Sequence, residues 1–300
     1  MRKFILPFLF APIGINTFGQ KENCEDKQYP APSLSDSIKK VYEVNLRAAE
    51  KKYKIDSTND EQIIWYGRRL AYLGNYKEAI GVYTKGINLH PNNPRFYRHR
   101  AHRYLTLRCY DNAIADLQKA IELIGDQIDE VEADGIPNEK NFPTSTLHTN
   151  IYYHLGLAYY LKGDNRQALL AWEKCLAISD NADMKVATLN WLNIVLRKMG
   201  RQKDADQHLR EVTNDMEIIE NHDYYDILIM YKTNDDSKLA EKTRNQETLS
   251  NATLGFALGT YYQLKGDKNK AKELFEKVVA GKQWNSFGYI AAGTELEKMK

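Results

Sequence analysis

Basic side chains are concentrated in one short stretch of the chain, between Arg95 and Arg108. This stretch contains five arginines and two histidines, and no carboxylate follows before Asp111. Guanidinium groups bind carboxylates and phosphates through paired hydrogen bonds. The stretch therefore predicts capture of an acidic peptide or of a chain-terminal carboxylate. The alternative is that these arginines pair with acidic residues of neighbouring helices, such as Asp116 and Glu122.

An acidic segment follows the arginines almost directly. Residues 126–139 carry six carboxylates, and the first basic residue after them is Lys140. One hypothesis is that this segment folds back onto Arg98 and its neighbours and shapes or masks the site that they form. The other is a solvated loop that its like charges keep extended. A calcium site is a third option, but the spacing of the carboxylates fits no regular calcium-binding loop.

Residues with catalytic or metal-binding chemistry form weaker patterns. His99 and His102 are three residues apart, so on a helix they can hold a metal only if a third ligand converges. No His-Glu-x-x-His, Gly-x-Ser-x-Gly or phosphate-binding loop occurs. We expect neither catalysis nor a cofactor, and a metal-dependent hydrolase is the weakest alternative. Three cysteines make no disulfide framework, and Cys109 and Cys175 are expected to be buried packing residues, because they fall at positions of the repeat described below where small packing side chains belong.

The helices that position these residues repeat along the chain. The marker Ala79 recurs 34 residues later as Ala113, then after 55 residues as Ala168, after 37 as Ala205 and after 66 as Ala271. The spacing of 55 equals one repeat plus an insert of 21 residues, and the spacing of 66 predicts a degenerate copy between two regular ones. No proline follows Pro143, as long runs of helix require.

These markers resemble the tetratricopeptide repeat, a helix–turn–helix unit of 34 residues. The resemblance implies an all-α solenoid, a right-handed superhelix of antiparallel helix pairs with a terminal capping helix. Its parts are a leading helix 34–55, repeats 60–93, 94–127, 149–182, 183–216, a degenerate 217–247 and 252–281, a capping helix 285–299 and an insert loop 126–147. We expect the polar end of the capping helix, with Glu295 and Glu297, to face solvent.

The resemblance also implies where a partner would bind. The first helix of each unit lines a concave groove, with its positions 2, 5, 9 and 12 on one stripe. On this basis we expect the ligand-binding residues to be Arg68, Arg95, Arg98, His102, Tyr153 and Tyr160. The expected function is therefore a non-catalytic scaffold for protein–protein interaction, with an acidic peptide or protein segment as its partner.

Aromatic residues offer a different interpretation, because exposed rings stack on sugars. Most of the twenty tyrosines and four tryptophans fall at packing positions of the repeat. Five aromatic residues remain as candidates for an exposed groove, namely Trp65, Tyr72, Tyr153, Tyr160 and Trp191. An exported carbohydrate-binding protein is therefore the alternative function.

The first residues resemble a secretory signal peptide. Arg2 and Lys3 precede an apolar run, and Thr17 and Gly19 are small residues before a cleavage point at Gln20. We expect a signal peptide at 1–19, an extended segment at 20–33 and a periplasmic or secreted protein. No later apolar run is long enough to span a membrane. A net charge of +2 argues against a dedicated nucleic-acid binder.

Overall fold

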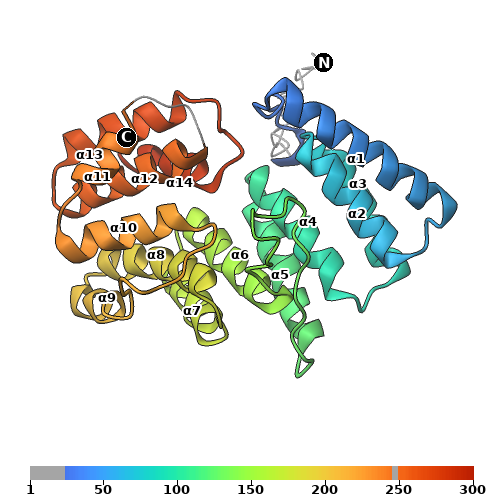
Figure 1. Cartoon of the computed structure of the whole chain (residues 1–300), viewed down its shortest axis with the longest axis horizontal. Helices are drawn as coiled ribbons and strands as arrows, with labels where there is room; N and C mark the ends of the chain where they lie inside the picture. Colours follow the sequence, from blue (N-terminus) through green and yellow to red (C-terminus); the bar gives the residue numbers. More distant parts are fainter. Residues whose placement is uncertain (1–23, 245–248) are drawn as a thin grey trace, which may run out of the picture.

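The structure is a computed structural model that describes residues 24–244 and 249–300, and within these ranges the chain is helical (Figure 1). The expected all-α solenoid is confirmed. The predicted signal peptide lies outside the described residues. The helices are α1 Asp36–Ile55, α2 Asp60–Tyr72, α3 Tyr76–Leu89, α4 Pro94–Thr106, α5 Tyr110–Ile124, α6 Leu147–Lys162, α7 Asn165–Ala177, α8 Ala182–Lys198, α9 Gln202–Leu209, α10 His222–Thr233, α11 Ser237–Lys242, α12 Leu249–Leu264, α13 Lys268–Val279 and α14 Phe287–Lys298.

Consecutive helices pack against each other in pairs, and the first helices of successive pairs also meet. Thus α2 contacts α4, α4 contacts α6, and α6 contacts α8. The helices follow a curved path in Figure 1, on which α1–α3 and α12–α14 form the two ends. The leading helix begins two residues later than expected, because the Ser35 side chain accepts the backbone N–H of Ile38 and caps it there.

Close contact within a pair depends on the small residue of the first helix. A Cβ atom at Gly156 in α6 would lie 2.3 Å from the indole nitrogen of Trp172 in α7. No side chain fits at this distance, so Trp172 packs directly on the α6 backbone, and its Nε1 donates to the carbonyl oxygen of Tyr153. The repeated small residue thereby sets the approach of the two helices.

The turn between α4 and α5 differs from the other turns within pairs. Four of those turns carry a glycine with positive φ, at Gly74, Gly163, Gly200 and Gly266, and the α10–α11 turn carries Asn234, with φ of 56°. In the α4–α5 turn the corresponding residue is Arg108, with φ of 61°. An L-residue with a side chain is strained in this left-handed region by roughly 1 kcal/mol. Arg108 therefore has to be held by contacts elsewhere.

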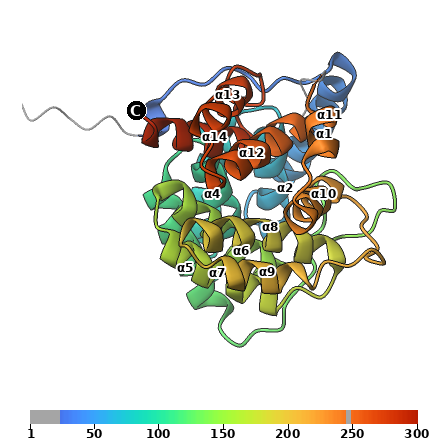
Figure 2. The same ribbon diagram turned by 90° about the vertical axis from the view of Figure 1, so that its left-hand side faces the viewer.

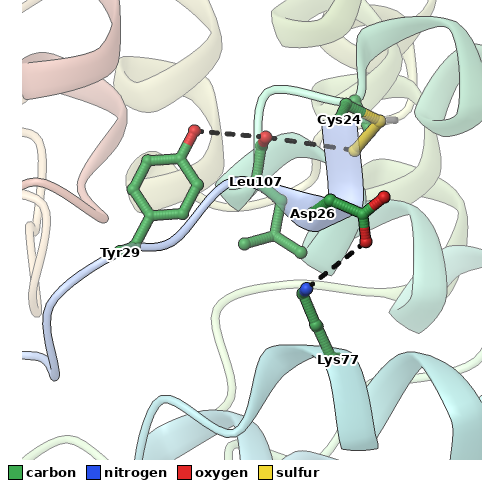
Figure 3. Close-up of a disulfide and its surroundings, with 6 residues drawn as sticks. Cys24, Asp26, Tyr29, Lys77 and Leu107 are labelled. Atoms are coloured by element: carbon green, nitrogen blue, oxygen red, sulfur yellow. Dashed lines mark hydrogen bonds and ion pairs between the residues drawn. A yellow bond between two sulfur atoms is a disulfide. The ribbon is translucent and has the colours of Figure 1, made fainter. Parts of the chain in front are cut away.

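A disulfide next to this turn holds the N-terminal segment on the solenoid. Cys24 and Cys109 are bonded, and nearby Tyr29 donates a hydrogen bond to the Leu107 carbonyl oxygen at 3.4 Å (Figure 3). The expectation that Cys109 is only a packing residue is therefore wrong. Sequence spacing could not reveal this bond, because the two cysteines are 85 residues apart. Cys175 is free and buried, as expected.

The segment before α14 closes the solenoid onto the same turn. The Trp284 ring stacks on Tyr29 with centroids 4.5 Å apart, and the Arg108 guanidinium lies over both rings. Arg108 also donates to the Trp284 carbonyl oxygen at 2.6 Å, and Asn285 donates to the Tyr76 hydroxyl. These contacts join the first and last repeats and hold Arg108 in its strained conformation.

Candidate functional site

A cavity of about 740 Å³, open to solvent, lies between the N-terminal and C-terminal repeats. Its wall comes from the segment before α1, from α1, α2, α4, α10 and α12, from the start of α3 and of α14, and from Ile136 of the insert. The wall combines aromatic rings with a few charged groups. The lining side chains include those of Tyr42, Tyr72, Tyr76, His102, Arg103 and Tyr224.

Arg103 supplies a positive charge to this cavity. Its guanidinium lies 5.7 Å from the centroid of the Tyr76 ring. Among residues 24–244 and 249–300, no carboxylate forms an ion pair with it. The acidic residues of the wall are engaged elsewhere: Glu220 accepts hydrogen bonds from Thr144 and Asn138, and Asp223 lies 3.7 Å from Lys242. The cavity therefore presents one guanidinium whose hydrogen-bonding capacity is open to a ligand.

A cluster of histidines lies beside Arg103. The rings of His102 and His154 are 4.5 Å apart, and His154 Nδ1 lies 2.6 Å from the Asn150 carbonyl oxygen. Burial and the positive charges of Arg98 and Arg103 lower the pKa of His154 to about 3. Burial, with Arg103 as the largest charge effect, likewise holds the pKa of His102 well below its ordinary value. Both imidazoles are therefore neutral at pH 7 and add no charge to that of Arg103.

The insert folds back onto the predicted arginine stripe, as the first of the hypotheses for it required. Arg98 Nε lies 2.9 Å from Glu132 Oε2, and both side chains are less than a tenth exposed. The same carboxylate oxygen accepts from Asn150 at 3.2 Å, and the other lies 3.8 Å from His99. Glu132 thus occupies the position at which we expected Arg98 to hold a partner's carboxylate.

Further contacts attach the insert to the N-terminal repeats. Arg68 donates to the Ala133 carbonyl oxygen and Arg69 to that of Gly135, both at 2.8 Å. Arg95 pairs with Glu61 of α2 and lies 3.6 Å from Glu130. Arg68, Arg95 and Arg98 are therefore all engaged within the chain.

The far end of the insert is attached to the segment before α10. Lys140 lies 2.6 Å from Glu217, and Asn138 donates to Glu220 at 3.2 Å. In Figure 2 the insert, in green, passes beside this segment. The insert therefore bridges the N-terminal and C-terminal repeats.

The alternative hypothesis was that the arginines pair with acidic residues of neighbouring helices. It is confirmed for Arg100. Its guanidinium donates two hydrogen bonds to Asp116 of α5, at 2.7 and 2.8 Å. Glu122, the other proposed partner, instead pairs with Lys119. The arginine-rich helix therefore divides its side chains between α5, the insert and, for Arg103, the cavity.

The predicted aromatic part of the groove is buried. Tyr153, Tyr160 and Trp191 are at most 7% exposed, so the expectation that they line an open groove is wrong. Trp191 donates to the Tyr153 hydroxyl at 2.8 Å, and the Tyr160 hydroxyl donates to Glu295 at 3.3 Å. They are buried because the C-terminal helices curl over α6 and α8. Glu295, expected at a solvent-facing end, is 1% exposed.

Of the predicted ligand residues, His102 alone lines the cavity, together with Tyr72 from the sugar-binding alternative. Sequence reasoning missed Arg103, Tyr42 and Tyr76 as wall residues. Arg103 was one of the counted arginines but lies one position beyond the expected stripe. No sequence signal singled it out, because α4 contains no acidic residue and its other arginines therefore lack a partner on the helix as well.

The described parts of the chain contain neither a group of side chains that could bind a metal ion nor a helix that could span a membrane. Within residues 24–244 and 249–300, no group of three or more His, Cys, Asp or Glu side chains could hold a metal ion. None of the helices described is long and apolar enough to cross a membrane.

Comparison with known proteins identifies the repeats. The family model for the tetratricopeptide repeat matches residues 149–181 and 256–280, which cover α6–α7 and most of α12–α13. The chain therefore contains tetratricopeptide repeats. Its fold is that of a protein–protein interaction scaffold, and solenoids of this kind present a concave binding surface.

Curated relatives match about half of the chain. Serine/threonine-protein phosphatase 5 of Rattus norvegicus is 28% identical over 146 residues, which are 48% of this chain and 25% of the phosphatase. Small glutamine-rich tetratricopeptide repeat-containing protein 2 of Saccharomyces cerevisiae is 29% identical over 154 residues, 51% of this chain and 37% of that protein. The chain thus spans only a quarter to somewhat over a third of these relatives.

Solved structures with similar folds are more distant in sequence. MamA is 20% identical, with a TM-score of 0.45, over 60% of this chain and 93% of that chain. YrrB, described as a TPR protein with an unusual peptide-binding site, is 14% identical, with a TM-score of 0.44, over 83% of this chain and 98% of that chain.

Proposed function

We propose that this protein is a non-catalytic scaffold that binds a peptide in its central cavity and holds one carboxylate of that peptide at Arg103. The observation that carries the proposal is the guanidinium of Arg103, which faces the cavity without a carboxylate partner among the described residues. Arginine binds a carboxylate through two parallel hydrogen bonds, which fix the ligand's orientation as well as its charge.

The remaining basic residues favour a single carboxylate over a continuous acidic stretch. The insert already provides Glu130 and Glu132 to Arg95 and Arg98. A long acidic peptide would have to displace these groups, whereas a carboxylate at Arg103 would not. A chain terminus or a lone Asp or Glu among apolar residues therefore fits the cavity best.

The tyrosines of the wall are suited to the rest of such a peptide. Tyr42, Tyr72, Tyr76 and Tyr224 line the cavity and offer ring faces together with hydroxyl groups. Rings of this kind give large contact areas at low cost in side-chain entropy, and their hydroxyls satisfy backbone groups. We propose that they contact the residues preceding the carboxylate.

The test uses matched peptides with a free or an amidated C-terminus. We expect pooled pentapeptides with an aromatic or apolar penultimate residue to bind the whole protein, and amidation to weaken binding at least tenfold. Arg103→Gln should abolish this difference. Arg166→Gln, which changes an exposed arginine of α7, is the control and should leave it intact. Equal binding of both peptide forms, or an unchanged preference in Arg103→Gln, would contradict the proposal.

Carbohydrate binding remains the second candidate, favoured by the four tyrosines of the same cavity. Rings stack on sugars without needing a charged partner. Titration with neutral oligosaccharides therefore separates the candidates. Binding that Tyr72→Ala abolishes and Arg103→Gln leaves unchanged would favour the sugar.

We also propose that the protein is exported to the periplasm or secreted by means of residues 1–19. The disulfide between Cys24 and Cys109 supports this, because disulfides persist in oxidising compartments and are rare in the cytosol. Expression of the full chain in a bacterium should give a periplasmic product that begins at Gln20 and has Cys24 oxidised. A full-length product that stays in the cytoplasm would refute export.

A further inference from the structure

The outer side of α1 carries a stripe of exposed aliphatic residues. Ile38, Val41, Val44 and Ile55 are 45%, 56%, 56% and 78% exposed, and Ala48 between them is also exposed. At about 100° per residue these positions fall within an arc of roughly 120° on the helix. An adjoining side of the helix, about 120° round from the centre of the stripe, packs on the solenoid through Leu46, Ala49 and Tyr53. The helix therefore has two apolar sides, of which one is covered.

The place of α1 in the array explains why a second side exists. It packs on α2 as α3 packs on α4 and α5 packs on α6, so it occupies the position of a second helix of a pair. A first helix belongs beside it. The described chain before α1 does not supply one, because from Cys24 to Ser35 it contains only a single 3-10 turn and is anchored at Cys109. Within the described residues, α1 therefore has no first helix beside it.

Basic residues border the exposed stripe. Lys40, Arg47 and Lys51 follow one edge of it, and Lys52 lies within it, between Val41 and Ile38 around the helix. None of these four forms an ion pair with any residue in 24–244 or 249–300. The acidic residues of α1, Asp36, Glu43 and Glu50, project from the other side of the helix, where Glu50 pairs with Lys54 at 2.5 Å. The surface thus joins an apolar stripe to unpaired positive charge.

We propose that α1 docks an amphipathic helix of a partner protein, whose apolar stripe is flanked by Asp and Glu, and that this helix completes the first pair of the solenoid. Ridges of branched and small side chains such as valine and alanine suit close packing of two helices. The acidic flanks would neutralise Lys40, Arg47 and Lys51. This surface is separate from the central cavity and does not depend on the function proposed for it.

Two other occupants fit the surface less well. A second copy placed with α1 against α1 would oppose basic edges to basic edges, which is unfavourable. An anionic membrane would match the charge, but helices that bind membrane interfaces rely on large apolar and aromatic side chains. The stripe of α1 has no aromatic residue. Both occupants are outcomes of the test below.

The probes are two designed helical peptides of eighteen residues with the same leucine stripe, one flanked by Glu and the other by Lys. We expect the Glu peptide to bind the full chain, as measured by fluorescence anisotropy, and the Lys peptide to bind at least tenfold more weakly. The double variant V41S/V44S should weaken the Glu peptide at least tenfold. The triple variant K40Q/R47Q/K51Q should do the same and reduce the dependence on salt.

Two controls keep the test specific to this face. Leu170→Ser removes an exposed leucine of α7, and Lys54→Gln removes a charge from the other side of α1, so both should bind the Glu peptide as the parent protein does. Circular dichroism checks the fold of each variant. Because the triple variant changes only exposed charges, it tests the proposal even if the double variant unfolds.

Several results would overturn the proposal. These are failure of the Glu peptide to bind, equal binding of the two peptides, and undiminished binding by the triple variant. A dimer in light scattering that V41S/V44S dissociates would assign the surface to a second copy. Sedimentation with phosphatidylglycerol vesicles that the triple variant abolishes would assign it to a membrane.

Discussion

Two buried glutamates complete the two halves of the concave side, and they do so in different ways. Glu132 reaches the N-terminal half from the insert and meets Arg98 and His99. Glu295 reaches the C-terminal half from α14 and meets Lys198, Lys298 and Gln263. Both carboxylates come from segments outside the regular helix pairs. The repeats therefore determine the direction in which each helix face points. The insert and α14 determine whether that face is covered or exposed to solvent.

The partners of the two glutamates differ in their acid–base chemistry. A guanidinium stays protonated throughout the usual pH range, so Arg98 keeps its charge when its partner is removed. An ammonium group can release its proton instead. Burial already lowers the pKa of Lys198, although Glu295 opposes this effect. Loss of the carboxylate should therefore lower the free energy of unfolding more in the N-terminal half than in the C-terminal half.

The largest effect is expected for Glu132→Gln. The substitution preserves the size of the side chain but leaves the buried Arg98 guanidinium without a counter-charge. Removing one member of a buried ion pair costs about 3–5 kcal/mol. We expect the free energy of unfolding, measured with urea, to fall by about 4 kcal/mol.

The matched control for this substitution is Glu130→Gln in the same insert. Glu130 is more than half exposed and lies 3.6 Å from Arg95, which also pairs with Glu61. Exposed pairs of this kind contribute less than about 1 kcal/mol. Similar losses for both variants would mean that the insert is held by its backbone contacts and that the buried pair adds little.

The helix pairs follow from the sequence because their signals are local and repeat. Small residues such as Gly156 and the spacing of the alanine markers reflect contacts within one pair or with its neighbour. Such contacts recur with the period of the chain. The degenerate pair formed by α10 and α11 also lies where the doubled spacing between Ala205 and Ala271 predicts it.

The candidate site was less predictable because long-range contacts form it. The disulfide of Cys24, the stacking of Trp284 on Tyr29 and the burial of Tyr160 under Glu295 each join segments that are distant in sequence. A position on a helical stripe says that a side chain faces inward. It does not say whether another segment covers that side chain. Here the insert covers Arg98, whereas Arg103 faces the cavity.

A smaller effect is expected for Glu295→Gln in the C-terminal half. The carboxylate accepts from Lys198 at 2.7 Å and from the Tyr160 hydroxyl at 3.3 Å. Because Lys198 can lose its proton when the carboxylate is removed, we expect a loss of about 2 kcal/mol at pH 7, below the usual cost of breaking a buried pair. This loss should shrink as the pH rises toward 10, since a neutral amine needs no counter-charge.

The control for the C-terminal half is Glu297→Gln, two residues further along α14. Glu297 is exposed, and its substitution should change the free energy of unfolding by less than about 0.5 kcal/mol. A loss for Glu295→Gln that equals the loss for Glu132→Gln and does not vary with pH would show that the difference between arginine and lysine is unimportant here.

The smallest expected effect concerns acid, and it tests whether the histidine cluster near Arg98 and Arg103 makes the fold sensitive to pH. The groups that face His154 are Arg98, Arg103, His102 and the Asn150 carbonyl oxygen. Its pKa of about 3 in the folded chain lies below the ordinary value of 6.5.

Between these two pKa values the unfolded chain binds a proton at His154 that the folded chain does not. The contribution of His154 to stability is therefore lost as the pH falls below 6.5, with a slope that rises toward about 1.4 kcal/mol per pH unit and averages about 1 between pH 6.5 and 5. The variant His154→Asn should reduce the slope of the unfolding free energy between pH 6.5 and 5 by this amount, with titration of the His154 ring followed by NMR as the direct check. An unchanged slope, or a ring that titrates near pH 6.5 in the folded protein, would show that solvent reaches the cluster and that the cavity wall beside Arg103 opens in solution.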